Sequence, residues 1–504
     1  MDTPALFLLS VPHHIRRVNW EAGHKCPRYG PLMKLPEPMS WNRAEARKGK
    51  FDGKFILGVM TTGIYCLPSC AARPPKPQNV RLFTTEAEAK AAGLRACKRC
   101  RPDLYYKGED ENVALFQGLA ERIKNDPEGF ADASALAKKA GVSLTKLGDL
   151  FRDHAHLAPA SWLRRVRVKQ AAGELLSGRD KVAEIGFGAG FESESVFHRQ
   201  FLNQMRMTPG AYRALDGAEV FMLQLPPLYR AKEILGYHAR DPQSVSEKSE
   251  GNRIWKALHT EDGPAVLEIS IEPGQAWVRV HAERKLGQGS MAALHAAALK
   301  ILSLTNDVSQ FETRHADFVK NRRGLRMPLL PTGFDALCWG IIGQQINVKF
   351  ASSLRRDMVE LAGEKIGEMR AHPTPQRVAD IDISALAARR YSRSKARYLV
   401  EAAQAVAGGK LDIENLGEGS AIAAEKALTA QHGIGTWTAR YVLMRGGFAD
   451  AAPVGDAALA AALQRLHQLP ERPDADQSAR LMSVYAPHRS LATMHLWTYL
   501  KEAA

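Results

Sequence analysis

Two pairs of closely spaced cysteines constrain this chain more than any other feature of its sequence. Cys66 and Cys70 lie in TTGIYCLPSC, and Cys97 and Cys100 lie in RACKRCRPD. Thiols at these spacings form disulfides, bind a metal ion or include a reactive nucleophile. Because four sulfurs match the tetrahedral coordination of Zn(II), the spacing favours one zinc ion per chain. A purely structural zinc site remains the alternative to a reactive one at this point.

Length and composition bound the remaining possibilities. A chain of 504 residues is too long for one hydrophobic core, so we expect several domains. Its longest apolar stretches, such as ALFLLSV and FILGVM, are far shorter than a membrane span, and the first lacks the flanks of a secretory signal. We therefore expect a cytoplasmic protein with no membrane partner, and disulfides are rare in that compartment.

The charge balance suggests a partner. The sequence carries a formal net charge of +15, and a surplus of Lys and Arg favours a polyanion, because each neutralised phosphate releases counterions. Nucleic acid is the leading candidate, and solvated surface charge is the alternative. A DNA partner would associate the protein with the nucleoid.

The residues around the cysteines indicate a family. FDGKFILGVMTTGIYCLPSC and then NVRLFTTEAEAKAAGLRACKRCRPD resemble the methyl-accepting N-terminal domain of the Ada alkylation-response proteins, over about residues 40–106. The resemblance implies that Cys66 is both zinc ligand and nucleophile, and that Cys70, Cys97 and Cys100 complete the site. It also implies irreversible transfer of a methyl group from a DNA methylphosphotriester to Cys66.

The basic residues beside the second cysteine pair are candidate phosphate contacts. Arg95 and Arg99 are expected to touch DNA, and exposure to solvent is the alternative for each. Methylation of one thiolate removes one negative charge, so we expect the methylated protein to bind DNA more tightly. The sequence departs from the family at Leu67, where an Arg commonly follows the first cysteine.

A helical region follows the acidic break GEDEN. DASALAKKAGVSLTKLGDLFRDH has the apolar spacing, the turn glycine and the capping serine of a helix-turn-helix unit, and KVAEIGFGAGFESESVFHRQF begins a second unit. The region resembles the DNA-binding domain of AraC-type activators over about residues 113–215. By that resemblance the recognition helices run from about 143 to 153 and from 193 to 202. The residues expected near DNA are Ser143, Thr145, Lys146, Ser193, Ser195 and His198.

The second helix-turn-helix unit is less suited to DNA binding than the first. Glu192 and Glu194 place acidic side chains where the second unit needs phosphate contacts. We therefore expect promoter binding to depend mainly on the first unit. Whether the second unit binds DNA stays open.

The pattern of apolar residues changes again at about residue 220. FMLQL and AVLEISIEP alternate apolar and polar residues and predict antiparallel strands, whereas almost everything after residue 308 is predicted to be helical. In ALTAQHGIGTWTARYVLMRGG two helical patterns are joined by HGIG. Gly433 and Gly435 permit a tight turn whose backbone N–H groups can hold a DNA phosphate.

This half of the chain resembles the AlkA-like 3-methyladenine DNA glycosylases over about residues 220–500. GLRMPLLPTGFDALCWGIIGQQINVKFA, the HGIG hairpin, the later GD and PHRSLATMHLW are its marks. The resemblance implies that Asp456 is the catalytic carboxylate, with a helix cap as the ordinary alternative. Trp437 and Tyr441 are expected to line the base pocket, and Gln345 either contacts the duplex or caps a core helix.

Trp437 also bears on the reaction. Glycosylases of this superfamily that also cleave the strand carry a Lys where this chain has Trp437, so we expect a monofunctional enzyme that only hydrolyses the base–sugar bond.

The expected fold class is a multidomain, mainly α chain with α+β parts. We expect an unassigned extension (1–36), a small zinc-binding α/β domain (37–107) and an all-α double helix-turn-helix domain (113–216). A strand-rich subdomain (219–307) and an all-α helix-hairpin-helix glycosylase domain (308–504) follow.

The expected function is alkylation repair joined to transcription activation, through methyl transfer, promoter binding and excision of bases such as 3-methyladenine. The alternative is a non-enzymatic zinc-containing regulator with an inactive glycosylase-like domain. Expected partners are double-stranded alkylated DNA, promoter DNA and RNA polymerase, and we expect a monomer.

Overall fold

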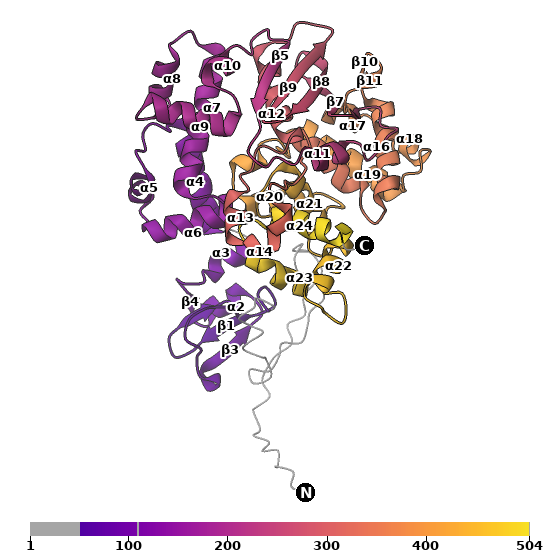
Figure 1. Ribbon diagram of the computed structural model, residues 1–504. Helices are drawn as coiled ribbons and strands as arrows, with labels where there is room; N and C mark the ends of the chain where they lie inside the picture. The colour runs from indigo at the N-terminus through magenta and orange to yellow at the C-terminus, as the bar shows by residue number, and fades with distance from the viewer. Residues whose placement is uncertain (1–50, 108–109, 503–504) are drawn as a thin grey trace. The chain divides into compact units, whose positions relative to one another are not determined.

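The computed structural model divides into two units, with the boundary between Asp110 and Glu111. The structure describes residues 51–107 and 110–502 (Figure 1), so the expected extension over residues 1–36 lies outside the described residues. Among the described helices, none combines the length and the apolar character that a membrane crossing requires.

The first unit is a small sheet with two short helices. Its strands are ordered β3-β1-β2-β4, where β1 pairs antiparallel with β2 and β3, and β2 pairs parallel with β4. Ile56, Tyr65, Phe83 and Leu94 fill the core beneath the sheet. The elements are β1 (Ile56–Val59), β2 (Ile64–Cys66), η1 (Pro77–Asn79), β3 (Val80–Phe83), α2 (Glu86–Ala91), β4 (Arg95–Ala96) and α3 (Pro102–Lys107).

The second unit begins with two helix-turn-helix halves that share one long helix, α7 (Pro159–Ser177). Trp162 of this helix packs in the core of the first half, whereas Val168 and Leu175 pack in the core of the second. The first half contains α4 (Glu111–Asn125), α5 (Ala133–Ala140) and α6 (Leu144–Ala155), and the second contains α8 (Val182–Gly188), α9 (Glu194–Met205) and α10 (Pro209–Arg213).

The turn chemistry of the first half follows from its sequence. Gly141 ends α5 with φ 67°, a left-handed conformation that glycine adopts without steric cost. The Ser143 hydroxyl then accepts a hydrogen bond from the Lys146 amide and so begins α6. The predicted helix-turn-helix is therefore present, although α6 and α9 each extend two or three residues beyond the predicted ends.

A five-stranded antiparallel sheet with order β5-β9-β8-β7-β6 follows. Its inner face packs against α12 and also against the second helix-turn-helix half, with which it shares one core. The elements are β5 (Val220–Gln224), α11 (Ala231–His238), β6 (Glu247–Glu250), β7 (Arg253–Thr260), β8 (Gly263–Glu272), β9 (Gln275–Ala282) and α12 (Gln288–Ile301).

The rest of the chain is a helical domain built around α15 (Gly333–Ile342), all of whose residues are buried. The surrounding helices are α13 (Ser309–Arg314), α14 (Ala316–Val319), α16 (Val348–Ala362), α17 (Pro375–Ala379), α18 (Ile383–Ala387), α19 (Arg393–Ala407), α20 (Ala421–Thr429), α21 (Thr436–Gly446), α22 (Ala457–Leu466), α23 (Ala475–Met482) and α24 (Arg489–Glu502). Short 3-10 turns η2 (Lys320–Arg322), η3 (Leu416–Glu418) and η4 (Ser483–Tyr485) join them.

One small element departs from the all-helical prediction for this domain. The strands β10 (Lys365–Ile366) and β11 (Met369–Arg370) form a hairpin around Gly367, whose φ is 54°. Ile366 packs with Ala257 and Val266 of the large sheet, which explains why this stretch is extended rather than helical. The predicted multidomain fold class is otherwise confirmed.

Candidate metal centre and aromatic pocket

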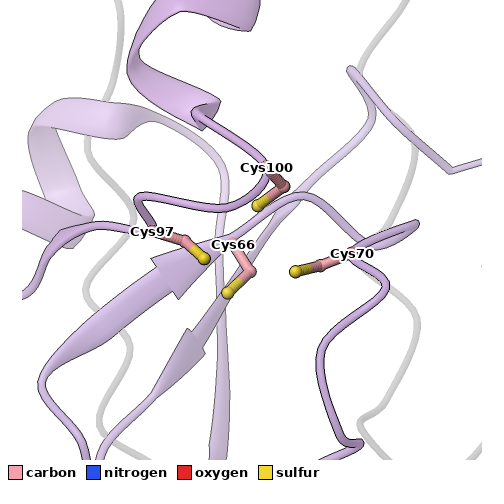
Figure 2. A group of neighbouring side chains, drawn as sticks. All are labelled: Cys66, Cys70, Cys97 and Cys100. Atoms are coloured by element: carbon pink, nitrogen blue, oxygen red, sulfur yellow. The ribbon is translucent and has the colours of Figure 1, made fainter. Parts of the chain in front are cut away.

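The sheet of the first unit brings the two cysteine pairs together. Cys66 ends β2, and Cys97 directly follows β4, the strand that pairs parallel with β2. Cys70 is brought back by a turn in which its amide donates to the Leu67 carbonyl at 3.1 Å. Cys100 lies in the turn before α3. Figure 2 shows the four side chains, which come from different segments and converge on one point.

The geometry of this cluster fits zinc. The four sulfurs lie within 4.8 Å of one another, and all four thiols are free. Sulfurs that share a tetrahedral zinc ion at about 2.3 Å lie about 3.8 Å apart, so only small adjustments separate this arrangement from a bound state. Within the described residues this is the one group of ligating side chains with such proximity. The chain therefore has a four-cysteine zinc site.

The pKa values of the four thiols also indicate that the ionised cluster needs a cation. A hydrogen bond with Cys100, together with burial, raises the pKa of the Cys66 thiol far above its ordinary range. Hydrogen bonds donated by Cys66 and other neighbours lower the pKa of Cys100 to about 6 despite burial. Four sulfurs this close cannot all ionise without a positive ion between them, and a bound metal ion supplies that charge.

Neighbouring groups hold the loop of Cys70 in place. Asp52 accepts hydrogen bonds from the Ser69 amide, at 3.0 Å, and from the Ser69 hydroxyl. The Leu67 amide donates to the Cys100 sulfur at 3.4 Å. Arg95 and Arg99, the candidate phosphate contacts, are exposed near the cluster.

The predicted DNA-contacting residues of the helix-turn-helix region lie at the starts of two helices. Ser143 and Ser193 are the N-caps of α6 and α9, so their hydroxyls already accept backbone hydrogen bonds. Three others are exposed or partly exposed on the first turns of these helices: Thr145, Lys146 and Ser195. Two of the set have side-chain neighbours: His198 lies 3.6 Å from Glu194, and Lys146 donates to the Asn112 side chain at 2.7 Å.

The predicted hairpin joins α20 to α21. Gly433 has φ 78°, and a Cβ built there would lie 2.2 Å from the ring of Tyr398, so only glycine fits. Gly435 is the N-cap of α21 and has open space around it. The side-chain amide of Gln344 donates to the Gly433 carbonyl at 2.9 Å and to the Thr438 hydroxyl at 3.0 Å.

Gln344 and Gln345 therefore have different roles. Gln344 braces the hairpin, whereas Gln345 is exposed and has φ 56°. The cap of the following helix α16 is Asn347, whose side chain accepts from the Phe350 amide. The expectation that Gln345 caps a core helix is wrong, and contact with the duplex remains the prediction for it.

Past this hairpin, three aromatic side chains form a cluster, and one of them contacts Asp456. The rings of Trp437 and Tyr441 are stacked, with centroids 5.3 Å apart and an interplanar angle of 25°. The Trp497 ring lies 6.5 Å from Tyr441, and its indole nitrogen donates to Asp456 Oδ1 at 3.1 Å. These residues come from α21, the start of α22 and α24.

The Asp456 side chain caps α22 and also accepts a hydrogen bond from outside that helix. Its Oδ1 accepts from the Leu459 amide at 2.8 Å and from Trp497. Its second oxygen, Oδ2, accepts no hydrogen bond from the described residues. A carboxylate with one anchored and one available oxygen can face a cationic reaction centre while its orientation stays fixed.

Two arginines pack against this aromatic cluster. Arg445 is 6% exposed, and its guanidinium lies over the rings of Tyr237, Tyr441 and Trp497 at 5.2, 5.3 and 5.5 Å. The guanidinium of Arg240 lies over Tyr237 and Trp339, at 4.1 and 4.4 Å.

The sequence interpretation missed five of these groups: Tyr237, Arg240, Trp339, Arg445 and Trp497. Trp339 and Trp497 lie in the segments ALCWGIIGQQ and PHRSLATMHLW, which carried part of the family resemblance, so a signal for them existed. Tyr237 and Arg445 lie in ordinary helical patterns, and only the packing of distant helices brings them to the pocket.

Comparisons with known families assign each region. Residues 39–103 match the family described as the metal binding domain of Ada, and residues 136–215 match a helix-turn-helix domain. Residues 338–488 match the HhH-GPD superfamily of base excision DNA repair proteins.

Similar proteins cover the chain in different ways. A Mycobacterium tuberculosis protein, "Probable bifunctional transcriptional activator/DNA repair enzyme AlkA", is 28% identical over 91% of this chain and 95% of its own length. A Bacillus subtilis DNA-3-methyladenine glycosylase is 29% identical over 56% of this chain and 97% of its own. The Escherichia coli "Bifunctional transcriptional activator/DNA repair enzyme Ada" is 30% identical over 36% of this chain and 49% of its own.

Among solved structures, the 3-methyladenine DNA glycosylase of Archaeoglobus fulgidus aligns with 56% of this chain and 99% of its own. The TM-score is 0.50 at 18% identity, so this likeness concerns the fold alone. The chain thus joins an Ada-type zinc-binding domain, an AraC-type helix-turn-helix region and a helix-hairpin-helix glycosylase fold, which confirms the predicted fusion.

Proposed function

We propose that this chain is a bifunctional DNA repair enzyme and transcriptional activator, which excises alkylated bases by hydrolysis and accepts methyl groups from DNA. The observation that carries the proposal is the carboxylate of Asp456, held by Trp497 beside the stacked Trp437–Tyr441 pair. The names of the Mycobacterium tuberculosis and Bacillus subtilis relatives, which describe an activator with repair activity and a 3-methyladenine glycosylase, support it.

The glycosylase reaction follows from this arrangement. A base flipped out of the duplex would stack on the Trp437 and Tyr441 rings. As the base–sugar bond breaks, positive charge develops on the sugar, and the free oxygen of Asp456 stabilises that charge while water attacks the anomeric carbon. The Gly433–Gly435 hairpin would hold a phosphate of the same strand through backbone amides. Because Trp437 occupies the position of a lyase amine, the strand stays intact.

The methyl transfer belongs to Cys66. Its thiolate attacks the methyl carbon of a DNA methylphosphotriester, a carbon–sulfur bond forms, the carbon–oxygen bond breaks, and the phosphate leaves as an ordinary charged diester. Zinc, when bound, keeps the thiolate deprotonated at neutral pH. Arg95 and Arg99 lie exposed near the cluster and can contact the DNA backbone. The product thioether is not hydrolysed, so each chain reacts once.

The regulatory part would use the helix-turn-helix region on promoter DNA. Methylation of Cys66 removes a negative charge next to the DNA, so the methylated protein would bind its promoter more tightly. RNA polymerase is the partner that such an activator would recruit.

One experiment tests the proposal against a regulator without enzymatic activity. The purified protein is incubated with methylated duplex DNA, released bases are measured by chromatography, and the cysteine-containing peptides are weighed by mass spectrometry. The proposal predicts free alkylated base and one added methyl group on Cys66. Absence of both products would leave the regulator as the better account.

A further inference from the structure

The hydroxyl of Tyr441 has an unusual hydrogen-bonding arrangement. Its oxygen accepts from the indole nitrogen of Trp339 at 3.1 Å and from Arg445 Nε at 3.2 Å. A phenol oxygen that accepts two hydrogen bonds still carries its own proton. Within the described residues no acceptor receives that proton. The Tyr441 ring is held by its stack on Trp437, so the hydroxyl has a fixed position with a proton available for a ligand.

Two guanidinium groups supply positive charge around this oxygen, and Asp456 is the carboxylate whose charge reaches Arg445. Arg445 is buried, and its Nη1 donates to the Pro328 carbonyl, at 2.8 Å, and to the Met327 sulfur, at 3.4 Å. Arg240 is stacked on two aromatic rings. Neither arginine forms an ion pair with an acidic residue in the described part of the chain. A phenolate at Tyr441 would therefore be stabilised by two guanidinium groups and by the Trp339 N–H.

The electrostatics agree with this geometry. Burial by itself raises the pKa of the Tyr441 hydroxyl, but the charges of Arg445 and Arg240 and the two donated hydrogen bonds outweigh burial and lower it below its ordinary value. The hydroxyl is thus a better proton donor than a free tyrosine.

We propose that Tyr441 is a proton donor to the departing base. This rests on the glycosylase function proposed above and concerns the same pocket. In the step, the base–sugar bond breaks and its electron pair goes to the base. The Tyr441 proton passes to a ring nitrogen or carbonyl oxygen of that base, leaving a phenolate. Water adds to the sugar and loses its proton to solvent, and the phenolate regains a proton from solvent.

This role distinguishes two classes of damaged base. A purine alkylated on a ring nitrogen already carries positive charge and leaves as a neutral molecule without any added proton. A damaged base that is neutral in DNA would leave as an anion unless it is protonated. Tyr441 should therefore matter for neutral bases and much less for cationic ones, whereas a stacking or structural role would affect both classes alike.

Three side chains from different helices contact the Tyr441 ring or hydroxyl: Arg445 on its own helix, Trp339 on α15 and Trp497 on α24. Arg240, just after α11, acts on Tyr441 through its charge, and Tyr237 and Asp456 interact with Arg445. Arginine stays charged throughout the accessible range, so the proton-donating form of Tyr441 is lost only as pH rises through its own pKa.

Single-turnover excision by Tyr441→Phe tests the proposal, because phenylalanine keeps the stacking ring and removes the hydroxyl. Two duplexes are compared at neutral pH, one with 7-methylguanine, which is cationic, and one with hypoxanthine, which is neutral. We expect hypoxanthine release to fall by about 100-fold and 7-methylguanine release to change by less than about 3-fold. Tyr499→Phe is the matched control, because the Tyr499 ring lies under Arg322 and outside the pocket, and it should leave both rates unchanged.

Each other outcome has a definite meaning. Equal losses on both duplexes, or no loss on either, would overturn the proton-donor role. Release of 7-methylguanine but not hypoxanthine by the wild-type protein would also overturn it, because the donor would then serve no substrate. Release of neither base by the wild type would instead refute the glycosylase function on which the inference depends.

A second measurement detects the proton itself. Replacement of Tyr441 by 3,5-difluorotyrosine keeps the ring and the hydroxyl but lowers the phenol pKa. The alkaline decline of hypoxanthine release should move to lower pH by the difference between the two phenol pKa values. An unshifted profile on the same duplex would contradict proton donation by this hydroxyl.

Discussion

The indole nitrogen of Trp497 donates to Oδ1 of Asp456 at 3.1 Å, although the two residues belong to different helices of the C-terminal domain. This bond and the amide of Leu459 fix one carboxylate oxygen and leave the other for the reaction. The orientation of the carboxylate therefore depends on a tryptophan that also forms part of the aromatic pocket.

The hydrogen bond predicts a defect in Trp497→Phe. The aromatic ring stays, but the carboxylate loses a donor whose bond to a charged group is worth about 1.5 kcal/mol, so base release should slow by about 10-fold. Single-turnover rates on alkylated duplex measure the effect. Trp277→Phe is the control, because Trp277 is an exposed tryptophan on the large sheet, and its rate should equal that of the wild type. A wild-type rate for Trp497→Phe would show that the bond is dispensable.

The hairpin predicts that replacing Gly433 by alanine is damaging and that replacing Gly435 by alanine is not. Gly433→Ala forces a left-handed residue and a contact with the Tyr398 ring, so we expect unfolding free energy to fall by about 2 kcal/mol and DNA affinity to fall by about 10-fold. Gly435 has φ −85° and open space, so Gly435→Ala should change both quantities little. Denaturant unfolding and fluorescence anisotropy with a short duplex provide the comparison, and similar effects of the two variants would argue against the role given to Gly433.

The cysteine cluster predicts a separation of metal binding from methyl transfer. Cys66→Ala leaves three thiolates, and water can take the fourth position, so much of the zinc content should persist while methyl uptake disappears. Cys338→Ala, which removes a buried thiol far along the chain from the cluster, should keep both. Zinc is measured with a chelating dye and methylation by mass spectrometry of the peptides. Methyl uptake by Cys66→Ala would mean that another cysteine is the acceptor.

Local patterns in the sequence predicted part of this architecture, and long-range packing decided the rest. The cysteine pairs and the capping of α6 by Ser143 were predictable, because each depends on residues a few positions apart. The hairpin at Gly433 was predictable for the same reason. The bracing of that hairpin by Gln344 could not be foreseen, because Gln344 and Gly433 are 89 residues apart in the sequence.

The aromatic cluster near Asp456 also depends on contacts between residues far apart in the sequence. Trp437 and Tyr441 are one helical turn apart, so their proximity follows from the sequence. Trp339 and Trp497 reach Tyr441 and Asp456 only because α15 and α24 pack against α21 and the start of α22. The spacing of apolar residues within one helix does not indicate which distant helix will pack against that helix.

Base release by wild-type protein and Asp456→Asn on alkylated duplex tests the central claim most directly. Asparagine caps a helix as well as aspartate does, so the fold and DNA affinity should persist. The charge that stabilises the sugar cation is lost, so release of 3-methyladenine should fall by about 100-fold or more. Asp474→Asn, which alters another helix cap, should excise normally. Excision by Asp456→Asn at the wild-type rate would contradict the account.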